Sequence, residues 1–271
     1  MIHVESIESL DGPGLEPYRT MKRPLDHQRR GIFVAEGEKV VRRLLESPLS
    51  VDSLLLPPKG LQEFEPSLRR RGEEVRVYLA EKNMLESLTG FTFYQGVLGV
   101  GRIPVPTSVD DVLRSSPRPR LLAAVEGLSN ATNMGVMVRN CAAFGVQGFI
   151  LGEGCCSPFL RRAVRNSMGA IFRLPAVEVR SLAETLRRFR MEGIRCVAAH
   201  PRAKERRLPE ADLSGDCCLV FGGEGFGLSP AILDACDGAV AIPMVSGVDS
   251  LNVANAAAIF LYEARRQRGW G

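Results

Sequence analysis

The sequence has no long apolar run. Its two longest, residues 239–245 and 256–262, hold seven residues each, far fewer than the roughly 20 that a membrane-spanning helix needs. The first thirty residues carry Glu5, Glu8 and Asp11 and lack the apolar core of a secretory signal peptide. We therefore expect a chain with no membrane segment and a cytoplasmic location.

The cysteine and histidine spacings of metal sites are also missing. None of the seven cysteines forms a C-x-x-C pair, and the three histidines are scattered along the chain. A chain of 271 residues can bury a core without disulfides. We therefore interpret all seven cysteines as small buried apolar residues and predict no metal site. His200 ends a strand-like run, where a binding role and a partly buried polar tip are both open.

Lysine is scarce: of 35 basic residues 30 are arginine, and the net charge is only +4. The planar guanidinium of arginine suits phosphate groups, and the basic residues gather locally. A solvated surface would explain any one cluster, but three clusters favour an anionic polymer as the partner. They are Arg19, Lys22, Arg23, Arg29 and Arg30; Arg161, Arg162 and Arg165; and Arg202, Lys204, Arg206 and Arg207.

The composition indicates two domains. Residues 104–119 hold four prolines and three serines, which is typical of a linker, so we predict domains at 1–103 and 120–271. The first domain mixes one helical pattern with strand-like runs. The helical pattern covers 38–47, and the strand-like runs cover 51–57, 75–80 and 96–103.

In the second domain, strand-like and helical patterns alternate regularly. The strands are continuously apolar, which indicates an α/β domain with a parallel sheet covered on both faces. The predicted strands are 121–128, 148–152, 195–200, 217–222 and 239–244. The predicted helices are 133–144, 181–193 and 250–267, with two more opened by Ser157-Pro158 and Ser229-Pro230.

Ligands of open parallel sheets bind beyond the carboxyl ends of the strands, so the turns after strands are candidate sites. The turn after 217–222 gathers four glycines around Glu224, and glycines let backbone N–H groups approach a ligand closely. It is neither a P-loop nor a G-x-G-x-x-G turn. Residues 223–227 read G-x-G-x-G, as in Rossmann-type methyltransferases, but that loop follows the first strand of its domain. A plain tight turn also stays open.

Three turns together resemble the motifs of the SpoU (TrmH) branch of the SPOUT RNA methyltransferases. The first is Asn133-x-Gly135-x-x-x-Arg139, the second is GGEGFGL within 219–228, and the third runs from IPM through SLNVAN. Their order and their strand spacing agree with the family over about 120–268. Before the linker, the resemblance is looser and is to the small substrate-binding domain that often accompanies these enzymes.

The resemblance implies a trefoil knot in the C-terminal domain, S-adenosylmethionine as the cofactor and a ribose 2′-hydroxyl as the methyl acceptor. Three departures, Thr132 in place of proline, Gly223 in place of a larger residue and the pair Ala254-Asn255, remove no proposed catalytic group. The catalytic residues implied are Arg139, Asn133, Glu224, Ser250 and Asn252. The cofactor-binding residues implied are Gly222, Gly223, Gly225, Ile242, Pro243, Met244 and Leu251. Contacts to RNA are expected from Arg19, Arg23, Arg29, Arg30 and Arg165.

The sequence therefore predicts an RNA 2′-O-ribose methyltransferase, with ribosomal RNA favoured over transfer RNA. Because a free guanidinium stays protonated, a simple base is not the expected role of Arg139. Charge stabilisation on the ribose oxygen, a phosphate contact and proton acceptance by a desolvated Arg139 are all open. The alternatives are a non-catalytic RNA-binding or assembly protein with the same fold, and a knotted methyltransferase that acts on a base nitrogen.

We also predict a homodimer through the C-terminal domain. The last helix is apolar over more of its circumference than one stripe can bury, so it needs either its own domain or a partner to cover it. Family members pair through this domain, which implies that Arg161, Arg162 or Arg165 could reach RNA across the interface. The apolar positions are Val253, Ala256, Ala257, Ile259, Phe260 and Leu261.

Overall fold

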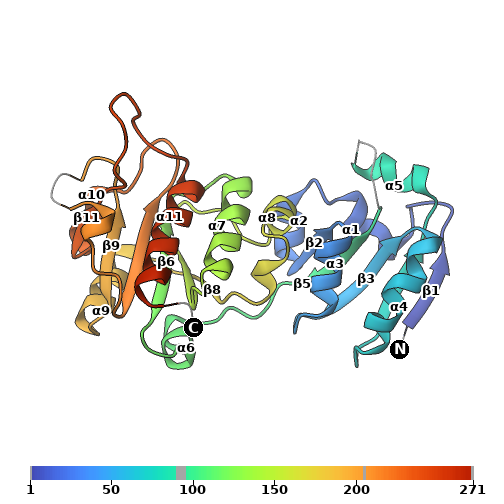
Figure 1. The fold of residues 1–271 in the computed structure, drawn as a ribbon. Coiled ribbons are helices and arrows are strands. Elements are labelled where there is room, and N and C mark those ends of the chain that lie inside the picture. Colours follow the sequence, from blue (N-terminus) through green and yellow to red (C-terminus); the bar gives the residue numbers. More distant parts are fainter. Residues whose placement is uncertain (1, 90–95, 204–205, 270–271) are drawn as a thin grey trace. The chain divides into compact units, whose positions relative to one another are not determined.

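The computed structural model describes residues 2–89, 96–203 and 206–269 and divides the chain into two compact units (Figure 1). The first unit is Met1–Val105 with Phe159–Arg173, and the second is Pro106–Pro158 with Leu174–Gly271. Along the sequence, the first boundary between the two units lies between Val105 and Pro106, near the domain boundary predicted at 103/104. The segment 159–173, which the sequence analysis assigned to the C-terminal domain, groups with the first unit instead.

The first unit is built on a five-stranded mixed sheet in the order β1-β4-β3-β5-β2. Strand β5 is antiparallel to both of its neighbours, and the other pairs are parallel. Its strands are β1 (Ile2–Ser6), β2 (Ile32–Glu36), β3 (Val51–Leu56), β4 (Val75–Leu79) and β5 (Leu98–Arg102). Its helices are η1 (Pro13–Leu15), α1 (Glu16–Arg19), α2 (Pro24–Arg29), α3 (Glu38–Leu45), η2 (Pro58–Gly60), α4 (Leu61–Arg69), α5 (Lys82–Thr89), α8 (Arg161–Asn166) and η3 (Ala170–Phe172).

A buried carboxylate attaches segment 159–173 to this sheet. Glu36, at the end of β2, is only 3% exposed. Its two oxygens pair with Arg161 Nη1 and Arg165 Nη1, each at 2.6 Å. Beside them the Phe33 ring lies 5.3 Å from that of Phe159 and 5.4 Å from that of Phe172. Ionic and aromatic contacts therefore hold the segment at the same strand.

The second unit is built on a six-stranded sheet in the order β11-β9-β10-β6-β7-β8. Every pair in it is parallel, which confirms the predicted parallel sheet. Its strands are β6 (Leu121–Glu126), β7 (Gly148–Leu151), β8 (Ala176–Glu178), β9 (Arg195–Ala199), β10 (Cys217–Gly222) and β11 (Gly238–Val240). Its helices are α6 (Val109–Ser115), α7 (Ala131–Ala143), α9 (Leu182–Met191), η4 (Leu208–Glu210), α10 (Pro230–Ala235) and α11 (Val253–Gln267).

Several predicted elements differ from the structure. The three-residue strand β8 was not predicted, and the strand predicted at 239–244 ends at Val240. Helix α6 lies within the predicted linker, where Ser108 and Asp111 form a capping box. The helix predicted to open at Ser157-Pro158 begins only at Arg161, because the chain leaves the second unit at Pro158.

Asparagine side chains determine where the helices α7 and α11 begin. These two helices lie beside the second sheet and frame the site. Asn130 Oδ1 accepts hydrogen bonds from the backbone N–H of Thr132 and Asn133 and caps α7. Asn252 Oδ1 accepts from the N–H of Ala254 at 2.9 Å and caps α11, so that helix starts three residues later than predicted. Helices α7 and α11 pack on each other (Figure 1).

The cysteines are free thiols, and five of the seven are buried. The prediction that all are buried is wrong for Cys155 and Cys156, which are partly exposed because they lie in the loop after β7 rather than in a strand. Burial still raises the pKa of the Cys156 thiol to about 11, so this thiol stays protonated at neutral pH.

In the described part of the chain, no helix has the length and apolar character needed to cross a bilayer.

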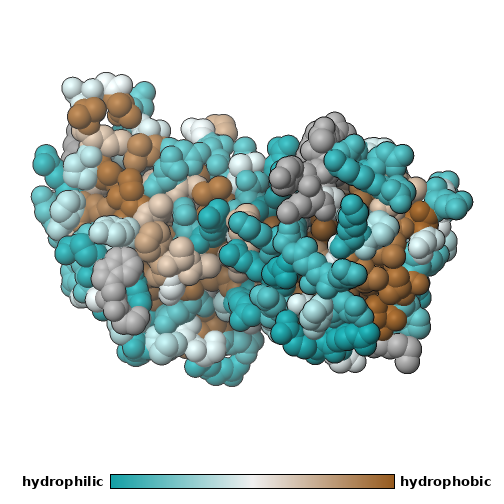
Figure 2. Space-filling view, turned by 45° about the vertical axis from the view of Figure 1, so that its right-hand side comes forward, coloured by the Kyte–Doolittle hydropathy of each residue, from teal (hydrophilic) through white to brown (hydrophobic). Residues whose placement is uncertain are grey.

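Apolar side chains also reach the surface of the second unit. The loop that follows β11, at the upper left of both views, shows hydrophobic groups at its tip (Figure 2). In the sequence between β11 and α11, Val245 is 77% exposed and Val248 is 48% exposed. Phe226, in the loop after β10, is fully exposed.

The Glu36 arrangement predicts that Glu36→Gln lowers the free energy of unfolding by about 2 kcal/mol, because two arginines lose a buried charged acceptor. Urea denaturation followed by circular dichroism measures this change. Glu65→Gln is the matched control, since Glu65 pairs with Arg69 on an exposed helix face where such pairs contribute little. Equal effects of the two substitutions would contradict the role given to Glu36.

Candidate active site

The carboxyl ends of parallel strands meet at one edge of the second sheet, and the segments that follow β9, β10 and β11 enclose a cavity of about 680 Å³. These three strands are neighbours in the sheet, and β6 lies next to β10. This is where ligands of open parallel sheets bind. The cavity is lined by residues of 199–202, 221–228, 240–244 and 249–260.

The loop after β10 folds tightly on itself, and its glycines make this possible. A Cβ on Gly222 would lie 2.2 Å from the carbonyl carbon of Gly227, and one on Gly223 would lie 2.0 Å from the oxygen of Gly127. Gly225 and Gly227 have φ values of +92° and +68°, which favour glycine. The close approach that the sequence suggested toward a ligand is here an approach of the chain to itself.

Glu126, at the end of β6, holds the far end of this loop. Its two carboxylate oxygens accept hydrogen bonds from Ser229 N and Ser229 Oγ, each at 2.8 Å. Its backbone oxygen accepts from Gly223 N at 2.6 Å. Glu126 was not among the predicted site residues, although an acidic residue that ends an otherwise apolar strand was a visible signal.

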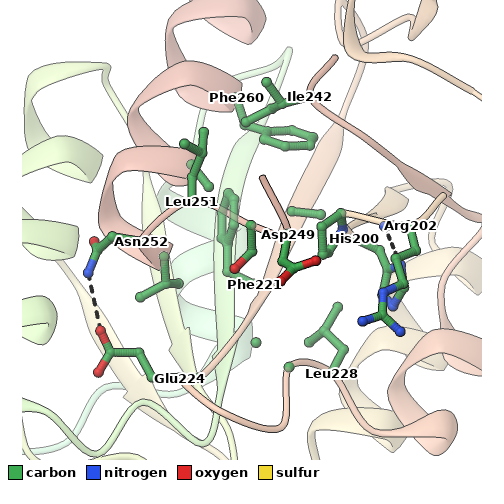
Figure 3. Close-up of a pocket in the computed structure, with 18 of the residues that line it drawn as sticks. His200, Arg202, Phe221, Glu224, Leu228, Ile242, Asp249, Leu251, Asn252 and Phe260 are labelled. Atoms are coloured by element: carbon green, nitrogen blue, oxygen red, sulfur yellow. Dashed lines mark hydrogen bonds between the residues drawn. The ribbon is translucent and has the colours of Figure 1, made fainter. Parts of the chain in front are cut away.

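Side chains from three separate segments meet at Glu224. Asn133 Nδ2 and Asn252 Nδ2 both donate to Glu224 Oε1, the second at 3.1 Å. Asn252 Nδ2 also donates to Asn133 Oδ1 at 3.2 Å, and Figure 3 shows its bond to Glu224. Because Asn252 Oδ1 caps α11, its amide can only turn its nitrogen toward the carboxylate. The structure thus brings together three of the five predicted catalytic residues.

The other two predicted catalytic residues lie apart from this network. Arg139 is exposed on α7, does not line the cavity, and makes no side-chain hydrogen bond or ion pair to any residue that the structure describes. Ser250 lines the cavity. Of the predicted cofactor residues, Pro243 is outside the lining. Those that line it are Gly222, Gly223, Gly225, Ile242, Met244 and Leu251.

The walls of the cavity combine apolar and charged groups. Phe221 and Phe260 meet edge to face with ring centres 5.8 Å apart, and both line the cavity. His200, Arg202 and Asp249 also line it (Figure 3), and none of the three was among the predicted site residues. His200 is partly buried and lines the cavity. Its position therefore agrees with both open interpretations, a binding role and a partly buried polar tip.

The predicted RNA-contacting arginines lie in the first unit. The four at positions 19–30 are exposed around α1 and α2. Arg19 pairs with Asp11 at 3.2 Å and Arg30 with Glu16 at 2.7 Å, whereas Arg23 and Arg29 have no side-chain partner among the described residues. Arg165 pairs with Glu36 and stays half-exposed.

Within residues 2–89, 96–203 and 206–269, no group of three or more His, Cys, Asp or Glu side chains is placed to hold a metal ion.

Curated relatives match this chain over most of its length. A protein from Mycobacterium tuberculosis described as an uncharacterized tRNA/rRNA methyltransferase is 34% identical, over 98% of this chain and 93% of its own length. The 23S rRNA (guanosine-2′-O-)-methyltransferase RlmB of Xanthomonas campestris pv. campestris is 32% identical, over 77% of this chain and 84% of its own length.

Solved structures of similar fold include the SpoU methyltransferase AviRb from Streptomyces viridochromogenes in complex with AdoMet. It has a TM-score of 0.81 and 26% identity, with 95% of this chain and 98% of that chain covered. The model of the SpoU rRNA Methylase family matches residues 120–262. That range contains all six strands of the second sheet and every segment that lines the cavity, and by this match the chain belongs to the SpoU rRNA methylase family, as the three motifs predicted.

Proposed function

We propose that this chain transfers a methyl group from S-adenosylmethionine to a ribose 2′-hydroxyl of structured RNA, with ribosomal RNA favoured over transfer RNA. The observation that carries the proposal is the meeting of Asn133, Glu224 and Asn252 at the edge of the cavity, since a bare binding module needs no such network. The printed function of the RlmB relative, a guanosine-2′-O-methyltransferase of 23S rRNA, supports the ribose and the ribosomal RNA.

The cavity fits the cofactor in size and in character. Its volume of about 680 Å³ is in the range of small-molecule sites. Aromatic and aliphatic walls suit an adenine ring, and Gly222, Gly223 and Gly225 of the glycine loop line the cavity. The residues that would hold the cofactor are Gly222, Gly223, Gly225, Ile242, Met244 and Leu251, with Pro243 shaping the loop between them.

When bound, S-adenosylmethionine supplies an electrophilic methyl group on a sulfonium. The ribose oxygen would bond to the methyl carbon as the carbon–sulfur bond breaks, which would leave S-adenosylhomocysteine, and the hydroxyl proton would pass to solvent. The protein therefore has to orient this oxygen and stabilise its charge. Glu224 Oε1 is occupied by two amides, whereas Oε2 accepts from none of the described residues and can orient an RNA hydroxyl. Arg139 stabilises the charge on the oxygen, and Ser250 contacts the neighbouring phosphate.

The first unit supplies affinity for RNA in this proposal. Arg19, Arg23, Arg29 and Arg30 surround two short helices and are exposed. The domain assignment proposed from the sequence, with 1–103 for substrate, 104–119 as linker and 120–271 for catalysis, differs from the compact units in segment 159–173. Arg165 of that segment remains a proposed RNA contact.

We also propose the knotted chain path and the cytoplasmic location implied by the resemblance. The insertion of β10 between β9 and β6 and the packing of α11 on α7 support the knot. An experimental chain trace that forms no knot when its two ends are pulled would contradict it.

The proposed reaction predicts where a labelled methyl group ends. After incubation of the protein with labelled S-adenosylmethionine and ribosomal RNA, nucleoside digestion should place the label on ribose 2′-oxygen. Arg139→Ala should lower this transfer at least about 100-fold and change the cofactor dissociation constant by less than about twofold, because Arg139 lies outside the cavity lining.

Arg187→Ala is the matched control, since Arg187 is an exposed helix arginine without a side-chain partner among the described residues. It should leave both quantities unchanged. Label on a base nitrogen would refute the ribose assignment, and an Arg139→Ala variant with most of its rate would refute the role of Arg139.

The basic cluster around α1 and α2 predicts a salt effect. Replacing Arg23 and Arg29 by alanine should weaken RNA binding and reduce the slope of log affinity against log salt by about 1.5, since each phosphate contact contributes roughly 0.7–0.9. A double variant of Arg69 and Arg114, exposed arginines already paired with carboxylates, is the control. An unchanged slope in the first variant would show that RNA is gripped elsewhere.

We propose a homodimer through the exposed face of α11. Its own unit buries Val253, Ala257, Phe260 and Leu261, whereas Ile259 is 40% exposed and Tyr262 is 49% exposed. Tyr262 meets Phe144, the C-cap residue of α7, edge to face, so the ends of the two helices share an apolar surface that a second copy can cover.

Light scattering tests this dimer. The wild-type protein should have a mass of twice 29.6 kDa, about 59 kDa, and Ile259→Arg should yield the single chain because it places a charge in the shared apolar surface. Val4→Arg, at an equally exposed apolar residue of the first unit, should stay dimeric. A wild-type particle of single-chain mass would refute the proposal.

A further inference from the structure

Charged groups stand in the cavity apart from the amide network. Figure 3 shows His200 and Arg202 together on one side and Asn252 with Glu224 on the other. Among the described residues that line the cavity, Arg202 alone is an arginine or lysine, and Asp249 and Glu224 are the carboxylates. The proposed methyl transfer assigns no task to Arg202, His200 or Asp249.

The backbone holds His200 and Arg202 in position at the end of β9. The N–H of His200 donates to Val240 O of the adjacent strand at 3.0 Å, and the N–H of Arg202 donates to His200 Nδ1 at 3.2 Å. Since a backbone amide can only donate, Nδ1 is an acceptor, and the proton of the neutral ring sits on Nε2. His200, which lines the cavity together with Arg202, therefore offers an N–H donor there.

The charges of Arg202 and Asp249 are unmatched within the protein. Neither side chain has a hydrogen bond or ion pair to a residue that the structure describes, whereas Glu224 is engaged by two amides. A cation and an anion, both unpaired and in one cavity, suit a ligand that carries both charges. The α-amino acid end of S-adenosylmethionine is such a group.

We propose that Arg202 and the His200 Nε2–H bind the α-carboxylate of the cofactor and that Asp249 binds its α-ammonium. This inference rests on the cofactor use proposed above and assigns its amino acid end to residues outside the three motifs. The adenosine end would then stay with the glycine loop and the apolar walls.

Two ligands distinguish binding of the amino acid end of the cofactor from binding of its adenosine end. S-adenosylhomocysteine has the amino acid end, and 5′-methylthioadenosine keeps the adenosine and the sulfur but lacks it. Titration calorimetry on the full-length protein should show that Arg202→Ala and Asp249→Asn raise the dissociation constant of S-adenosylhomocysteine about tenfold or more. Both variants should bind 5′-methylthioadenosine within about twofold of the wild type, because neither residue touches the adenosine end in the proposal.

Arg206→Ala is the matched control, because Arg206 belongs to the same basic cluster but does not line the cavity, and it should change neither constant. Unchanged S-adenosylhomocysteine binding in both variants would overturn the inference. Equal weakening of the binding of both ligands would also overturn it, because that would indicate a distorted loop. A loss of RNA affinity alone in Arg202→Ala would overturn it too, because that would indicate a phosphate contact. If the wild type binds neither ligand, the cofactor proposal itself fails and this inference with it.

Discussion

The site depends on one shared carboxylate oxygen. Glu224 Oε1 accepts the amide N–H groups of Asn133 at the start of α7 and of Asn252 at the start of α11. The loop that carries Glu224 can reach both because Gly222 and Gly223 let it turn against the chain at Gly227 and Gly127. A single acceptor therefore ties two helix starts to one loop, and the relative position of the three segments follows from it.

The parallel sheet explains why these segments are neighbours although they are far apart in the sequence. Because β6, β10, β9 and β11 run in the same direction, their carboxyl ends lie at one edge, and each following loop must cross that edge. Asn140 Nδ2 donates to Ala254 O at 2.7 Å and keeps α7 and α11 together about two turns along α7 from Asn133. Sheet direction brings the loops together, and hydrogen bonds between side chain and backbone set their register.

Local patterns predicted most of the second sheet, and non-local contacts account for what was missed. Continuous apolar runs identified five of its six strands, but β8 has only three residues and no such run. The move of segment 159–173 into the first unit depends on Arg161 and Glu36, which are 125 residues apart, so no local pattern could indicate it. Helix α6 was missed because the four prolines and three serines of residues 104–119 are typical of a linker.

Helix geometry gives different roles to Asn133 and Arg139, the two polar residues of the first motif. Arg139 follows Asn133 by six residues, which at 3.6 residues per turn places the two side chains about 120° apart around α7. Asn133 faces Glu224, and Arg139 lies on a different face of the helix, where it is exposed. A group so placed can meet an RNA that arrives from solvent but not a ligand enclosed behind Glu224. The cavity is thus the cofactor half of the proposed site, and the RNA itself must complete the half that contains Arg139.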